Sequence, residues 1–261
     1  MTDGVIVPEL ARDGSSKRQR SDTGPRLTER DLACLQWIAQ QYAIRLDQLQ
    51  RLLLRYTPQD DREKVRTGAD CLSKERTYRT LSRWERLHLI EFGNILDGEP
   101  RWIWLSAAGL REIGSGLRYN KPSAVRLRHL YWSNQVRLWV ESRRPADRWQ
   151  SEREIKSTHQ AREAGEHQEH LPDAILHAAN GRISAIEVEL EPKASRQLEA
   201  IVAELEAEYT SILYFAAPAA QRQLAALFAT LEPARRRHFL LYALGSGGNE
   251  DGMLLLEESS H

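Results

Sequence analysis

The chain has 261 residues, a length that suits one large domain or two small ones, and 41% hydrophobic with 28% charged residues is an ordinary globular composition. No apolar run approaches the roughly 18 residues that span a bilayer, and Cys34 and Cys71 lack CxxC spacing, so we expect no membrane partner and a cytoplasmic location. The net charge is zero, but residues 1–150 carry 27 Lys and Arg against 19 Asp and Glu, whereas residues 151–261 carry 10 against 18. If this asymmetry is not chance scatter of surface charge, the basic first part of the chain binds a polyanion and the acidic second part has a different role.

The first half of the chain predicts three helices followed by a β-hairpin. Residues 1–26 have no periodicity and are expected to be a flexible tail. Apolar residues at helical spacing then predict helices after Thr28, from Leu46 to about residue 57, and from Ser73 to Leu87, with a polar loop before the third. Strands at 89–95 and 101–105 flank an Asp-Gly turn, and Ser106 opens another helix.

This order of elements is that of a winged helix, an elaborated helix-turn-helix, which we place at residues 27–120. A connecting helix is predicted within residues 121–146, between two prolines. Strands alternating with helices predict a partly parallel, covered sheet at residues 147–245, followed by a second tail at 246–261. The predicted fold class is therefore α+β, with a winged helix followed by an α/β domain.

The third helix has the division of residues that a DNA-reading helix needs. Leu81 and Trp84 are expected to anchor it to the core, while the opposite face offers arginine for guanine edges and phosphates. The predicted contacts to double-stranded DNA are Lys74, Arg76, Arg79, Thr80, Arg83 and, at the base of the hairpin, Arg101. The alternative is a winged helix that serves only dimerisation or packing on the second domain.

Carboxylates in the second half predict a metal site. Period-two alternation places Glu187 and Glu189 on one face of a strand, and Asp173 begins the neighbouring strand. An Asp and a Glu on adjacent strands can hold Mg²⁺, which activates water for phosphodiester hydrolysis, and Lys193 could stabilise the developing charge. The alternative is a solvated edge face neutralised by Lys193 or Arg196.

The hairpin between these strands decides the geometry. A two-residue loop at Asn180-Gly181 would place Asp173 opposite Val188, on the wrong face. A three-residue loop with Gly181 in the left-handed conformation would pair Asp173 with Glu187, and this is the arrangement that we expect.

Two local patterns resemble known families. Residues 77–109 resemble the end of a bacterial winged helix, in which an aromatic strand runs into a Leu-Ser/Thr-x-x-Gly helix start; many such domains have glycine where this chain has His88. Pro172-Asp173 and Glu187-x-Glu189, with the acidic segment that contains Glu154 upstream, resemble the PD-(D/E)XK nuclease fold, which usually has Glu-x-Lys.

Taken together, residues 27–244 resemble the replication-relaxation family of actinobacterial plasmids and integrative elements. The resemblance implies a restriction-endonuclease-like second domain and a role in plasmid replication, mobilisation or DNA processing. As a nuclease, the chain would bind Mg²⁺ through Asp173 and Glu187, with Glu189 or Lys193 assisting and Glu154 completing the cluster.

Two main functions remain open at this point. One is a DNA-binding protein that nicks or cuts DNA near its bound site. The other is a non-enzymatic DNA binder, associated with nucleoid or plasmid, whose second domain serves a homodimer or recruits replication or mobilisation proteins. A third hypothesis, an adaptor without nucleic acid, makes the basic helix incidental. No P-loop, G-x-G-x-x-G or GxSxG pattern supports nucleotide hydrolysis or acyl transfer.

Overall fold

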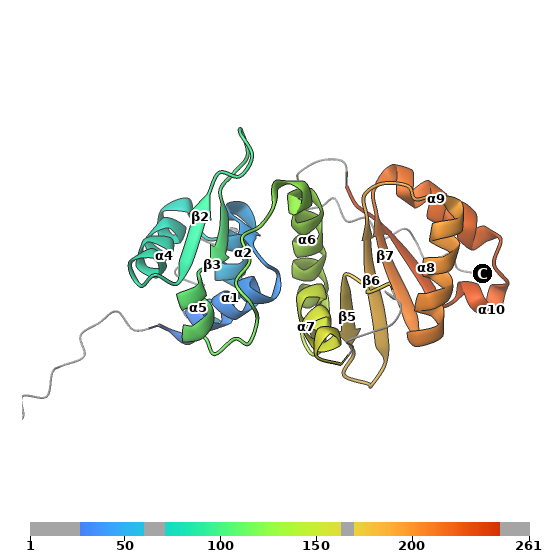
Figure 1. Cartoon of the computed structure of the whole chain (residues 1–261), viewed down its shortest axis with the longest axis horizontal. Coiled ribbons are helices and arrows are strands. Elements are labelled where there is room, and N and C mark those ends of the chain that lie inside the picture. Colours follow the sequence, from blue (N-terminus) through green and yellow to red (C-terminus); the bar gives the residue numbers. More distant parts are fainter. Residues whose placement is uncertain (1–26, 60–70, 163–169, 246–261) are drawn as a thin grey trace, which may run out of the picture.

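A computed structural model describes residues 27–59, 71–162 and 170–245, with no side chains described for 159–162. The two predicted tails therefore lie outside the described parts. The fold is mixed α+β, as predicted: helices with a small antiparallel sheet come first, and a five-stranded mixed sheet with helices follows (Figure 1). Within the described ranges, no helix is both long enough and apolar enough to cross a membrane.

The first half begins with a helix that is capped as predicted, because Thr28 Oγ1 accepts a hydrogen bond from Asp31 N at 3.2 Å. Its elements in chain order are α1 (Glu29–Gln40), β1 (Ile44–Arg45), α2 (Leu46–Arg55), α4 (Lys74–Arg86), β2 (Ile90–Gly93), β3 (Trp102–Leu105) and α5 (Ala107–Glu112). The three strands are antiparallel in the order β1-β3-β2, so the predicted hairpin gains a third strand that the sequence did not predict.

The second half contains more strands than predicted. Its elements are a 3-10 turn (Ala124–Arg126), α6 (Leu127–Arg143), β4 (Arg148–Ser151), α7 (Glu152–Arg162), β5 (Ala174–His177), β6 (Ile183–Glu189), α8 (Ser195–Glu208), β7 (Ser211–Ala216), α9 (Pro218–Ala229), α10 (Pro233–Arg236) and β8 (Phe239–Ala243). The sheet order is β4-β5-β6-β7-β8, antiparallel as far as β6 and parallel beyond it, which confirms the partly parallel sheet. β4 and α10 were not predicted.

The sheet is covered on both faces, with α6 on one side and α8 on the other in Figure 1. Strand β6 shows why, because successive side chains point to opposite faces. Ala185 packs in the cluster that contains Leu198 and Leu205 of α8, whereas Ile186 and Val188 pack in the cluster that contains Val136 of α6.

Helix α6 is shared by the two halves. Leu127 packs with the tryptophans of β3, while Val136 and Val140 pack on the large sheet. Between these apolar contacts runs a buried polar network: Asn134 Nδ2 donates to the Ala43 carbonyl at 2.9 Å, and Asn134 Oδ1 accepts from Gln41 Nε2 at 3.1 Å. The helix that connects the halves along the chain thus also joins their cores.

Candidate functional site

Helix α4 presents a basic face to solvent. Ser73 caps its start, and Thr77, Leu81 and Trp84 are buried against the rest of the first half. Lys74, Arg76, Arg79 and Arg86 are exposed. Figure 1 places α4 at the end of the molecule that lies farthest from the five-stranded sheet, so this face is open to a large partner.

Two predicted DNA contacts on α4 need correction. Thr80 is only 6% exposed, and its hydroxyl donates to the Arg76 carbonyl at 3.2 Å, because position 80 lies on the same helical face as Thr77 and Trp84. Arg83 donates to the buried carboxylate of Asp31 in α1, and Trp84 Nε1 donates to the same oxygen at 3.0 Å. Arg83 therefore attaches α4 to α1 and is not displayed as a reader of bases.

The hairpin between β2 and β3 carries the remaining predicted contact. Arg101 is exposed, with its guanidinium 5.4 Å from the ring centroid of Phe92. Gly98 adopts the left-handed conformation, at φ 78°, in the expected turn. Asp97 and Glu99 lie in the same loop, so a phosphate contact here would come from Arg101 at the base of the loop and not from its tip.

The position where winged helices often have glycine has the backbone that glycine favours. His88 lies at φ 55°, a left-handed conformation that few non-glycine residues adopt. Its carbonyl accepts a 2.5 Å hydrogen bond from Ser106 Oγ, the cap of α5. His88 therefore adopts the left-handed backbone that a glycine would favour at this position.

The predicted hairpin register in the second half is confirmed. Ala178 N donates to the Arg182 carbonyl at 2.9 Å and Gly181 is left-handed at φ 84°, which leaves a three-residue loop. Ala174 pairs with Ile186, so the preceding position, Asp173, faces Glu187 across the strands.

Asp173 is bound to α6. Its Oδ2 accepts hydrogen bonds from Val188 N at 2.8 Å and from His129 Nε2 at 3.2 Å. Burial alone would raise the pKa of Asp173, but the charge of His129 and the two hydrogen bonds outweigh it and lower the pKa. Burial would likewise lower the pKa of His129, but Asp173 raises it to about 8, so the pair carries opposite charges at neutral pH.

Glu187 has a different partner. It is 3% exposed, and His170 Nε2 lies 3.0 Å from its Oε1. Burial raises the pKa of Glu187 to about 7, while the hydrogen bond to Glu187 raises the pKa of His170. Neither histidine partner was predicted from the sequence, and no spacing pattern signals them, because each is brought to its carboxylate by tertiary packing.

Glu189 and Glu154 are also engaged. The Glu189 carboxylate accepts from Lys193 Nζ, the residue that the sequence placed nearby. Glu154 Oε2 accepts from Ser151 N and Oγ, both at 2.9 Å, which makes it a capping residue of α7, and Gln40 Nε2 donates to its other oxygen at 3.1 Å. Among the described residues, no hydrogen bond or ion pair joins Glu154 to Asp173 or Glu187, so the structure does not bring these three together.

The carboxylates as arranged do not fit a magnesium ion. Mg²⁺ needs several oxygen ligands that converge on one point. Asp173, Glu187 and Glu189 each face a separate cationic side chain, and among the described residues no three metal-ligating side chains converge.

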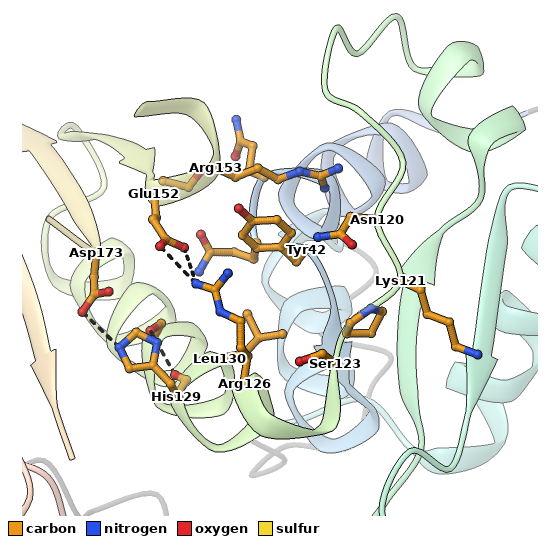
Figure 2. Close-up of a pocket in the computed structure, with 15 residues that line it drawn as sticks. Tyr42, Asn120, Lys121, Ser123, Arg126, His129, Leu130, Glu152, Arg153 and Asp173 are labelled. Carbon is orange, nitrogen blue, oxygen red and sulfur yellow. Dashed lines mark hydrogen bonds and ion pairs between the residues drawn. The ribbon is translucent and has the colours of Figure 1, made fainter. Parts of the chain in front are cut away.

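A pocket of about 100 Å³, open to solvent, lies between the two halves beside Asp173 (Figure 2). It is lined by the end of α1, the segment before α6, the first turns of α6, and the start of α7. Arg126, the last residue of the 3-10 turn before α6, forms an ion pair with Glu152 of α7 across its wall, with the closest N–O distance 2.9 Å.

Comparison with known proteins adds no assignment: no family model and no curated protein matches the chain.

Proposed function

We propose that the chain binds double-stranded DNA through a winged-helix first half, with α4 entering the major groove. The observation that carries the proposal is the outward face of α4, where Lys74, Arg76 and Arg79 are exposed on a helix anchored by buried residues. A major groove about 12 Å wide accommodates a helix, and arginine pairs with guanine edges and phosphates.

The arrangement around α4 supports this role. The order helix, strand, helix, helix, strand, strand, with the sheet order β1-β3-β2, matches the winged-helix plan that the sequence predicts. Arg83 and Trp84 bind α4 to Asp31 of α1, which holds the basic face in a fixed orientation. Arg79 pairs with Glu75 in the free protein, an exposed contact that a phosphate can replace at little cost.

For the second half, the observations favour a non-enzymatic role on a restriction-endonuclease-like sheet. Three of the four carboxylates of the expected nuclease site are paired with basic side chains: Asp173 with His129, Glu187 with His170 and Glu189 with Lys193. The nuclease hypothesis retains one supporting observation, the register that sets Asp173 opposite Glu187. We therefore propose a DNA-binding protein of plasmid or mobile-element replication or mobilisation whose sheet serves dimerisation or partner recruitment.

Duplex binding tests the proposal. In fluorescence anisotropy with a labelled duplex, Arg76→Ala/Arg79→Ala should weaken binding and reduce the slope of log K against log salt by about 2, because each phosphate contact contributes about 1. The matched control, Arg222→Ala/Arg237→Ala, removes two exposed arginines from the second half and should leave the slope unchanged.

Two results would contradict the proposal. An unchanged slope in the α4 variant would exclude α4 as the DNA-contacting element. Metal-dependent nicking of plasmid DNA by the wild type, lost in Asp173→Ala/Glu187→Ala, would make the second half an enzyme.

A further inference from the structure

The pocket between the two halves contains a buried cation that no described carboxylate neutralises. Arg153 is 7% exposed, and its guanidinium donates to the carbonyls of Ala39 and Arg118. It also lies 4.8 Å from the ring centroid of Tyr42. Within the described residues it forms no ion pair, and burial lowers its pKa. Because an uncompensated buried charge is costly, this wall of the pocket favours an anionic ligand.

Further donors line the same pocket. Arg126 is half exposed there, and although it pairs with Glu152, that carboxylate also accepts from Lys156. Arg126 can therefore turn to a ligand without leaving Glu152 unpaired. Figure 2 shows Arg126 reaching from the 3-10 turn before α6 toward Glu152 with Tyr42 beside it, and Ser123 on the segment before that turn.

The pocket also offers apolar surface. The ring of Tyr42, Pro122 and Leu130 lie in its lining, so a ligand can bury an apolar or aromatic part beside the charged groups. The enclosed volume of about 100 Å³ is below the usual range for small-molecule sites, roughly 300–1,000 Å³, so the pocket takes a charged group and leaves the rest of a ligand at its open mouth. Tyr42 itself is held at φ 68°, an uncommon backbone for a non-glycine residue, which sets its ring at the pocket wall.

We propose that this pocket binds the phosphate group of a phosphate monoester beside Arg126 and Arg153, with the organic part of the ligand near Tyr42 and Leu130 at the pocket mouth. Guanidinium forks match phosphate oxygens in charge and geometry. The same chemistry occurs in a free mononucleotide and at the 5′-phosphate end of a DNA strand. The site is separate from the basic face of α4, so it does not depend on the proposed mode of duplex binding.

Calorimetric titration of the full chain tests the site, with deoxyadenosine 5′-monophosphate compared with deoxyadenosine. The monophosphate should bind and the nucleoside should not. Arg126→Gln should weaken the monophosphate about tenfold or more, the loss expected for one charge-assisted contact. Arg128→Gln is the matched control, because Arg128 lies only two residues further along the chain, in the first turn of α6, pairs with Glu191 and is not in the pocket lining.

A second arm distinguishes the two sources of the phosphate. A 5′-phosphorylated octathymidylate that binds more tightly than its 5′-hydroxyl form, by a margin that Arg126→Gln removes, would assign the site to a strand end. Binding of the mononucleotide without such a margin would assign it to a free nucleotide. The proposal is overturned if neither probe binds, if nucleoside and monophosphate bind equally, or if Arg126→Gln and Arg128→Gln behave alike. Duplex binding by α4 can survive each of these results.

Discussion

At the scale of single residues, Asp31 is the buried charge on which the position of α4 depends. Its Oδ2 accepts from Thr28 N at 2.8 Å and from Thr28 Oγ1 at 2.7 Å, and its Oδ1 accepts from Trp84 Nε1 and Arg83. Burial alone would raise the pKa of Asp31, but these hydrogen bonds and the charge of Arg83 outweigh it and lower the pKa below 3.8.

Asp31→Asn should therefore reduce stability in a pH-dependent way. A carboxyl whose pKa is lowered by folding adds stability above its unfolded pKa, and that stability is lost as pH falls through the folded pKa. We expect a loss of roughly 2 kcal/mol at pH 7, which shrinks below about pH 4. Urea unfolding from pH 3 to 7 measures it. Glu75→Gln, on the exposed pair with Arg79, is the control and should change little. A loss of stability in Asp31→Asn that stays constant across this pH range would contradict the prediction.

At the scale of elements, helix α5 packs closely against Leu89, the residue that precedes strand β2. A Cβ atom on Gly109 would lie 1.9 Å from the carbonyl oxygen of Leu89, which accepts a 2.9 Å hydrogen bond from Ser106 N. The glycine that the resemblance to winged helices singled out is thus required by a close approach of helix to strand, and not by its own backbone angles.

Gly109→Ala should destabilise the protein by about 2–4 kcal/mol, because α5 must move away from β2 to admit the methyl group. Gly116→Ala is the matched control, since a Cβ there meets nothing within 4 Å. Thermal unfolding of the two variants measures the difference. Equal unfolding midpoints for the two variants would contradict this prediction, because they would show that α5 can move to admit the methyl group without loss of stability.

How much of the fold the sequence predicts also depends on the length of the elements. Helices with clear caps, such as α1 and α4, and the long strand β6 were predicted because local periodicity is strong over many residues. β1 and β4 were missed because each pairs with a segment that is distant along the chain, β1 with β3 and β4 with β5, and neither is joined to its partner by a hairpin turn.

The candidate site was likewise predicted only in part. The turn chemistry at Gly181 predicted which strand positions face each other, so the register of Asp173 and Glu187 was correct. The partners of those carboxylates, His129 and His170, depend on how α6 and the segment before β5 pack on the sheet, and no local pattern encodes that. The burial of Arg83 was missed for a similar reason, since Asp31 is 52 residues away along the chain.

At the scale of the whole molecule, α6 should make the two halves unfold together. Asn134 is fully buried and links Ala43, Gln41 and Gln48, so removing its amide leaves buried groups without partners. Asn134→Ala should cost about 2–4 kcal/mol, and Ser142→Ala, on the exposed side of α6, should cost little. Circular dichroism and tryptophan fluorescence should report one coincident transition for the wild type; two separate transitions would contradict this coupling.

Because α6 packs against both halves, it also limits how either half can be recombined with a domain from another protein. A gene fusion that joins this sheet to a foreign DNA-binding module has to carry residues 127–143 with the sheet, or Val136 and Val140 leave its core open. The incoming module must then offer a surface that receives Leu127 and the amide of Asn134. Under the proposed function, a change of DNA specificity is therefore expected to arise by substitution on α4, and not by exchange of whole domains.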